Sequence, residues 1–204
     1  MADHGTASRS TTELLPVFLK LEGRSVLLVG GGAVARAKLP DLLRAGARVT
    51  VVAPEVHAEI RASTVTVVAR RFLPGDIDGA WLVVAAASPE VNRDVAAAAE
   101  ERRVFVNAVD DADRASAYTA GVFRRGGLTI AVSTGGRAPA LAGLLREGLE
   151  ALVPEDVEAW VAAAQELRQA QRATGVPMTE RRPRLLAALN RLYEAKGVEV
   201  AAGT

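Results

Sequence analysis

Two adjacent carboxylates follow a short hydrophobic run in the segment FVNAVDD, residues 105–111. The run has the composition of a buried strand, so Asp110 stands where the chain leaves a sheet, and Asp111 comes next. Ligands of open α/β sheets bind at the carboxyl ends of the strands, where a carboxylate can accept a proton as a general base. Aspartate is also a common turn former. These residues alone support both interpretations equally.

A glycine turn, Gly30-x-Gly32-x-x-Ala35, follows the apolar run SVLLV and precedes a helical pattern. Glycines permit a tight turn and let the backbone approach a pyrophosphate, and Ala35 lets the helix pack closely on the strand. The helix N-terminus supplies N–H groups and the positive end of its dipole. This context predicts dinucleotide binding; the alternative is a tight turn without a ligand. The predicted cofactor-binding residues are Gly30, Gly31, Gly32, Ala33, Val34 and Ala35, with Pro54, Glu55, Ala86 and Ala87 after two later strands.

The second strand lacks the acidic residue that usually closes it and binds the adenosine ribose. It ends in Ala53 and Pro54, and Glu55 lies just beyond. Either Glu55 or the backbone therefore binds the ribose. Because no arginine follows directly to bind a 2′-phosphate, the sequence favours NAD over NADP.

Short valine-rich runs alternate with helical patterns up to about residue 114, which predicts a doubly wound parallel sheet. The expected strands are Ser25–Val29, Arg48–Pro54, Thr64–Phe72, Gly79–Ala87 and Val104–Val109, with a further short strand at Leu15–Leu21. The pattern then changes to a hairpin around residues 124–127 and, from Pro139 on, to amphipathic helices. We therefore predict an α/β fold: a disordered leader at 1–13, a Rossmann-type parallel sheet domain at 14–117, a small β segment with a connecting helix at 118–153, and a C-terminal helical domain at 154–204.

Composition excludes several classes of site. The chain of 204 residues has no cysteine, which rules out a disulfide framework, a thiolate metal site and a cysteine nucleophile, and fits a cytoplasmic protein. Its net charge of +1 gives no bulk attraction to nucleic acid or membrane. No apolar run approaches the about 18 residues that span a bilayer. His4 and His57 are too far apart to predict a metal site, and we expect none.

Six motifs together resemble one family. LPVFLKL, VLLVGGGAVARAK, VTVVAPE, VNAVDD, LTIAVSTGGRAPALAGLLRE and ALVP occur in the order and at the spacing of the precorrin-2 dehydrogenase family, which also forms the N-terminal part of sirohaem synthases. The resemblance runs from about Leu15 to Pro154 and implies the NAD-dependent oxidation of precorrin-2 to sirohydrochlorin. It also implies a homodimer joined through the β segment at 118–153. Some members insert Fe²⁺ or Co²⁺ into the product as well.

The resemblance assigns roles to particular residues. It implies that Asp110 is the base and leaves Asp111 as the turn residue. The substrate has eight carboxylates, and the loop STGGR offers hydroxyls, N–H groups and a guanidinium to them. The predicted substrate-binding residues are Ser133, Thr134, Gly135, Gly136 and Arg137, although Arg137 as a solvated surface charge is the alternative.

Several questions stay open in the sequence. Many members have an aromatic-x-x-proline after the two aspartates, where this chain has AYTAG, residues 117–121. That departure falls at the start of the predicted β segment at 118–153. Two other functions fit in part: an NAD-binding regulatory module without catalysis, which has no need of Asp110, and a chelatase alone, which has little use for the glycine turn. Whether the protein chelates a metal, and whether it serves a sirohaem or a cobalamin pathway, is not decided by these motifs.

Overall fold

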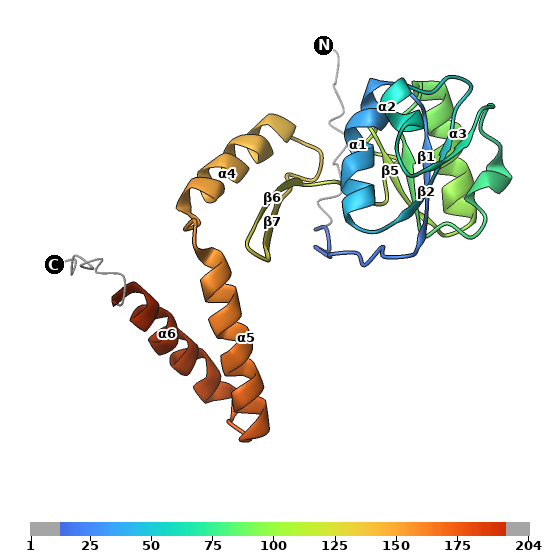
Figure 1. Ribbon diagram of the computed structural model, residues 1–204. Helices are drawn as coiled ribbons and strands as arrows, with labels where there is room; N and C mark the ends of the chain where they lie inside the picture. The colour runs from blue at the N-terminus through green and yellow to red at the C-terminus, as the bar shows by residue number, and fades with distance from the viewer. Residues whose placement is uncertain (1–12, 195–204) are drawn as a thin grey trace, which may run out of the picture. The chain divides into compact units, whose positions relative to one another are not determined.

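The computed structural model describes residues 13–194 (Figure 1). The predicted leader, except Glu13, and the last ten residues of the predicted helical domain lie outside this range. The chain divides into two compact units. One runs up to Thr119 and includes Gly135–Arg137; the other holds Ala120–Thr134 and the chain from Ala138 on. The proposed border between a β segment and a helical domain stays a prediction.

The first unit contains a five-stranded parallel sheet with the strand order β3-β2-β1-β4-β5. Its strands are β1 (Ser25–Val29), β2 (Arg48–Val52), β3 (Thr66–Val68), β4 (Leu82–Ala85) and β5 (Phe105–Ala108). The central strands are buried on both faces, which is why they read as continuous apolar runs. Strand order reverses between β1 and β4, so the ligand-binding crevice of this fold lies at their carboxyl ends. The predicted Rossmann-type fold is confirmed.

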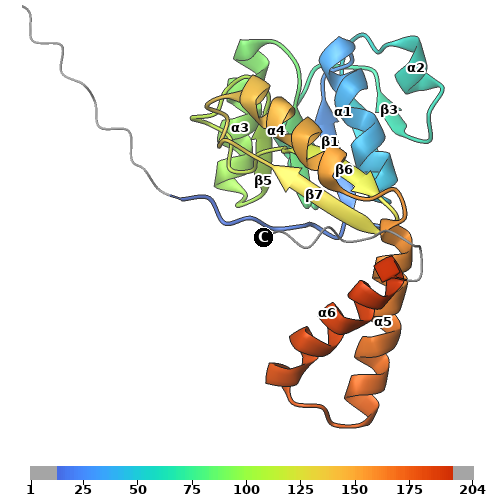
Figure 2. The ribbon, with the colours of Figure 1, turned by 90° about the vertical axis from the view of Figure 1, so that its left-hand side faces the viewer.

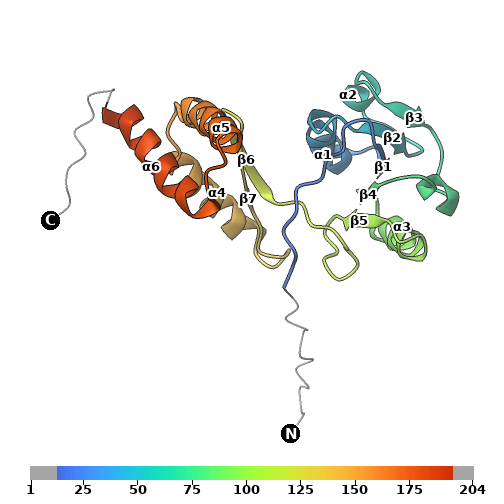
Figure 3. The ribbon, with the colours of Figure 1, turned by 90° about the horizontal axis from the view of Figure 1, so that it is seen from below.

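Helices cover both faces of this sheet (Figure 3). They are α1 (Ala33–Arg44), the short α2 (Ala58–Arg61), α3 (Pro89–Glu101) and a 3₁₀ turn, η1 (Pro74–Ile77). Successive residues of β1 point to opposite faces: Leu28 packs in one cluster with Leu39 of α1, and Leu27 packs in the other with Val95 of α3. These two layers of core pack against both faces of β1 and against α1, and so position the glycine turn between them.

The prediction of a strand at Leu15–Leu21 is wrong. No regular structure forms there, the residues up to Lys20 are exposed, and Leu21 is the first buried residue. Alternating apolar residues predict a strand only where a neighbour can pair, and Pro16 cannot donate a ladder hydrogen bond. The outer edge of β5 is covered by a later loop, in which the Ser116 and Ala117 N–H groups donate to the Val106 carbonyl at 2.9 and 3.0 Å.

The second unit begins with an antiparallel hairpin of β6 (Gly121–Arg125) and β7 (Leu128–Val132). Gly126 and Gly127 form its turn with φ of 50° and 81°, values that favour glycine and suit the twist of a hairpin. Helix α4 (Pro139–Leu152) covers the hairpin, and α5 (Val157–Ala173) and α6 (Met178–Glu194) form a helix pair beyond it (Figure 2). Within residues 13–194, no helix has the length and apolar character needed to cross a membrane.

Candidate cofactor and catalytic site

The glycine turn fits tightly between the ends of two neighbouring strands. The Gly30 N–H donates to the Val52 carbonyl at 3.0 Å, and Gly30 has a φ of 122°. A Cβ at Gly30 would lie 2.2 Å from the Ala86 carbonyl oxygen, and one at Gly31 would lie 2.0 Å from the Glu55 carbonyl oxygen. Both contacts are with backbone, which has no other rotamer to adopt. The structure thus brings together the predicted cofactor-binding residues that follow β1, β2 and β4.

The N-terminus of α1 is suited to an anion. Gly32 is its N-cap, no side chain caps it, and its first turn contains no acidic residue. The N–H groups of Ala33, Val34 and Ala35 have no acceptor within the helix, as in any first turn. A Cβ at Gly32 would meet nothing within 4 Å, so the space above these donors is clear. These residues fit the pyrophosphate of a dinucleotide.

Helix α3 starts at the same edge of the sheet, but side chains of its own first residues already bond to the N–H groups at its N-terminus. Ser88 Oγ accepts a hydrogen bond from the Val91 N–H at 3.5 Å. The Glu90 backbone N–H, and then the Ser88 hydroxyl, lower the pKa of the exposed Glu90 carboxyl and keep it negative. A negative side chain already occupies this helix end, so a phosphate is better placed at α1.

Glu55, one of the predicted cofactor-binding residues, lies with its backbone against the glycine turn at Gly31. Pro54 and Glu55 are exposed at the end of β2, and the His57 N–H donates to the Gly31 carbonyl at 2.8 Å. His57 itself caps α2, since its Nδ1 accepts from the Glu59 N–H at 3.3 Å. Among residues 13–194, no three His, Cys, Asp or Glu side chains gather in a way that could hold a metal ion.

Asp110 and Asp111 differ in their surroundings. Asp110 is exposed, has a left-handed φ of 61°, and its carboxylate has no hydrogen-bond or ion-pair partner within residues 13–194. Asp111 Oδ2 accepts from Arg114 Nη1 at 2.8 Å, and its carbonyl accepts from the Ala115 N–H at 3.2 Å. Asp111 therefore builds the turn, whereas the Asp110 carboxylate contributes nothing to it. Aspartate is one of the few residues that tolerate the left-handed conformation.

The predicted substrate loop, residues 133–137, is divided between the two units. Thr134 Oγ1 accepts from the Ala138 N–H at 3.0 Å, just before α4 begins, while Ser133 and Arg137 are exposed. Gly136 has a φ of 75°, and a Cβ there would lie 3.1 Å from the Ala112 Cβ. The segment Gly135–Arg137, which belongs to the first unit, therefore lies against the loop that follows the two aspartates.

Tyr118 explains how the AYTAG sequence fits this loop. Its hydroxyl donates to the Ala112 carbonyl at 2.6 Å, and its ring lies beneath Gly136, 3.3 Å from where a Cβ would stand. Tyr118 thus contacts both the segment that follows Asp110, at Ala112, and the connection between β7 and α4, at Gly136. Sequence reasoning noted the departure from the family pattern but did not assign Tyr118 this contact.

Asn92 is a second residue that sequence reasoning missed. It lies in the buried stripe of α3 with Val95, Ala96 and Ala99, and its side chain contacts the backbone after both β4 and β5. A single polar residue on an otherwise apolar helix face was the available indication.

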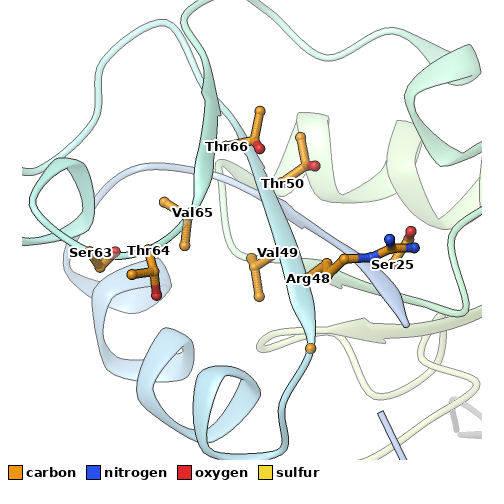
Figure 4. Close-up of a pocket in the computed structure, with 9 residues that line it drawn as sticks. Ser25, Arg48, Val49, Thr50, Ser63, Thr64, Val65 and Thr66 are labelled. Carbon is orange, nitrogen blue, oxygen red and sulfur yellow. The ribbon is translucent and has the colours of Figure 1, made fainter. Parts of the chain in front are cut away.

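A shallow pocket between β2 and β3 lies elsewhere (Figure 4). Its lining includes Ser25 and Arg48, the first residues of β1 and β2, so it lies toward the amino ends of these strands. Gly30 and Asp110 follow the carboxyl ends. The pocket is therefore not part of the candidate site.

Comparison with known proteins agrees with this geometry. Residues 17–121 match the model of a family described as "Putative NAD(P)-binding". The chain belongs to this NAD(P)-binding family. Residues 125–152 also match the family described as "Sirohaem biosynthesis protein central". The predicted dinucleotide-binding domain is thus confirmed.

Among curated relatives, "Siroheme synthase 3" of Aeromonas hydrophila is 46% identical over 175 residues, covering 83% of this chain and 37% of the relative. "Siroheme synthase 1" of Aeromonas salmonicida is 44% identical over 191 residues, covering 90% of this chain and 41% of the relative. The chain therefore spans about two fifths of the length of these relatives. A solved structure titled "SirC, precorrin-2 dehydrogenase" matches with a TM-score of 0.67 and 28% identity, covering 85% of this chain and 88% of that one. The resemblance drawn from the motifs is confirmed.

Proposed function

We propose that this protein catalyses the NAD-dependent oxidation of precorrin-2 to sirohydrochlorin. The observation that carries the proposal is the pairing, at one edge of one sheet, of two features: a helix N-terminus without a side-chain cap beside the glycine turn, and the Asp110 carboxylate, which has no partner among residues 13–194. The first suits a dinucleotide and the second suits a base. The names of the similar siroheme synthases and of the similar precorrin-2 dehydrogenase support the choice of substrate.

Each residue then has a defined task. The N–H groups at the start of α1 bind the pyrophosphate, and Glu55 accepts hydrogen bonds from the ribose hydroxyls. The carboxylate of Glu55 disfavours a 2′-phosphate, which makes NAD the better cofactor. NAD, when bound, supplies the hydride acceptor. The substrate loses one hydride and one proton, and Asp110 accepts the proton from the macrocycle. Ser133, Thr134, Gly135, Gly136 and Arg137 bind its carboxylates.

The test is an anaerobic assay with enzymatically made precorrin-2 and either NAD or NADP. We expect sirohydrochlorin and reduced cofactor to appear together in equal amounts, and faster with NAD. If the folded protein binds NAD but forms no product, the dehydrogenase proposal fails and a regulatory NAD-binding module takes its place.

Two finer points stay predictions. Insertion of Fe²⁺ or Co²⁺ into sirohydrochlorin needs a base and a substrate metal; no observation among the described residues favours it over dehydrogenation alone. The prediction of a cytoplasmic location is based on the absence of cysteine from the sequence.

We also propose a homodimer through residues 118–153. Helix α4 buries Ala142 and lies against the hairpin there, since a Cβ at Gly121 of β6 would lie 3.5 Å from the Ala142 carbonyl oxygen, yet α4 exposes a row of leucines. Their exposed fractions are 49% for Leu141, 66% for Leu144, 49% for Leu145, 38% for Leu149 and 78% for Leu152. Contiguous apolar surface of this kind marks an interaction site. A second copy of the chain is the occupant that the family resemblance implies.

Replacing Leu144 and Leu152 together by glutamate should dissociate the dimer. Burying each leucine contributes about 1.5–3 kcal/mol, so the dissociation constant should rise by about 100-fold or more. Size-exclusion chromatography with light scattering measures the mass across a dilution series. Leu73→Glu is the matched control, since Leu73 is 55% exposed in the first unit. A wild type that is monomeric at every concentration would contradict the proposal.

A further inference from the structure

Asn92 is buried, with an exposed fraction of 6%, on the side of α3 that faces β4 and β5. Polar side chains are buried in this way only when the hydrogen bonds they make offset the loss of water. Both halves of the Asn92 amide are used. The Oδ1 atom accepts from the Ala87 N–H at 2.9 Å, and Nδ2 donates to the Val109 carbonyl at 3.5 Å.

The Ala87 N–H and the Val109 carbonyl would bond directly to each other if the ladder between β4 and β5 continued. Strands β4 and β5 run in register, with Ala85 opposite Ala108, and the Val109 N–H donates to the Ala85 carbonyl at 3.0 Å. In a regular parallel ladder the Ala87 N–H would next donate to the Val109 carbonyl. The Asn92 amide stands between them and makes one bond to each. It therefore replaces the last bond of the ladder and holds the two strand ends apart.

The separation occurs where the chemistry is expected. Ala86 and Ala87 follow β4, and the Ala86 carbonyl is the group that the glycine turn approaches at Gly30. Val109 directly precedes Asp110. The side chain of Asn92 thus links the backbone that borders the cofactor site with the backbone that carries the Asp110 carboxylate.

We propose that Asn92 is a positioning residue for the dehydrogenation: its Oδ1 fixes the loop beside the cofactor, and its Nδ2 fixes the peptide that presents Asp110. The inference rests on the proposed function, because it assigns Asp110 to the reaction. Its two halves act on different steps. Loss of the Oδ1 bond affects NAD binding, and loss of the Nδ2 bond affects the proton transfer.

Asn92→Asp separates the two halves. The carboxylate has the same shape and still accepts from the Ala87 N–H, but it has no proton to donate and faces the Val109 carbonyl with like partial charge. We expect the Kd for NAD to stay near the wild-type value while kcat falls by about tenfold or more, because a base displaced by a fraction of an ångström acts poorly. The KM for NAD should not change.

The pH dependence provides a second readout. Burial raises the pKa of a carboxyl group, so an aspartate at position 92 takes up a proton as the pH falls. The protonated form donates to the Val109 carbonyl and restores the lost bond. The ratio of the kcat of N92D to that of the wild type should therefore rise as the pH falls. A role in stability alone gives no reason for this rise.

Asn92→Leu removes both bonds without adding a buried charge. We expect NAD affinity and kcat to fall together at every pH, with no recovery in acid. This variant tests the positioning role if N92D does not fold.

Amide hydrogen exchange at Ala87 reports, without substrate, on the bridge that the Asn92 side chain makes between Ala87 and Val109. The Ala87 N–H should be protected in the wild type and N92D and exchange faster in N92L. Asn190→Asp, at an exposed position of α6, is the control and should match the wild type.

The outcomes separate the two proposals. Folded N92D with wild-type kcat and a flat ratio across pH, or N92L with wild-type kcat and NAD affinity, would overturn the positioning role and leave the dehydrogenase standing. A wild type that forms no product would remove the proposed function and the positioning role with it. Ala87 protection lost only in N92L would then still support the bridge as a structural element.

Discussion

Asp110→Asn should lower kcat for precorrin-2 oxidation by about 10²–10⁴-fold, the usual contribution of a general base, and leave NAD binding unchanged. The Asp110 carboxylate has no partner within residues 13–194, so the substitution breaks no contact of the fold. Asparagine keeps the shape of the side chain and tolerates the left-handed backbone. Sirohydrochlorin absorbance gives kcat, and calorimetric titration gives the Kd for NAD.

Asp111→Asn is the neighbouring control. It weakens an exposed ion pair with Arg114, a contribution of about 0–1 kcal/mol, and should keep most of the activity. Asp110→Gly adds a further contrast, because glycine adopts a positive φ without strain: Tm should rise while activity is lost. If Asp110→Asn retains wild-type kcat, Asp110 is a turn residue. If it loses NAD affinity instead, the carboxylate belongs to the cofactor site.

The sheet could be predicted from the sequence because its evidence is local. Apolar runs such as 25–29 and 79–87, each followed by a turn and a helical pattern, specify parallel strands without knowledge of the rest of the chain. The segment 15–21 also has a local strand pattern, of alternating apolar residues, and forms no strand. Whether a segment pairs as a strand depends on which other strand lies next to it in the fold, and the periodicity of its own residues carries no information about that neighbour.

The same distinction, between local sequence patterns and contacts with distant segments, separates the site residues that were predicted from those that were missed. Gly30, Glu55 and Asp110 were predicted because each follows a strand, and parallel strands bring their carboxyl ends to one edge. Asn92 and Tyr118 were missed because their partners are main-chain atoms of other segments: the Asn92 amide bonds to Val109, 17 residues away. A helix pattern shows that Asn92 faces inward, but only the structure shows the gap in the ladder that it fills. The assignments of individual site residues remain predictions that the substitutions test.

Gly32→Ala should weaken NAD binding and leave the fold intact, whereas Gly31→Ala should damage both. A Cβ at Gly32 would meet no protein atom within 4 Å, and its φ of −88° suits alanine. That Cβ would instead occupy the space above the first N–H groups of α1, where the pyrophosphate is proposed to bind. Hydrogen bonds to a charged group contribute about 1.5–3 kcal/mol each, so each one lost raises the Kd for NAD by about tenfold to a hundredfold.

At Gly31 the added Cβ would lie 2.0 Å from the Glu55 carbonyl oxygen, so the turn and the end of β2 must move apart. Overpacking of this kind costs about 1–3 kcal/mol, and Tm should fall together with NAD affinity. Gly75→Ala, whose Cβ would make only an ordinary contact 3.7 Å from Asp78 Oδ2, is the control and should change neither. Thermal unfolding and calorimetric titration of the three variants measure both quantities. A Gly32→Ala protein that binds NAD as the wild type does would exclude the pyrophosphate from this helix end, because nothing else stands in the space that the new methyl group fills.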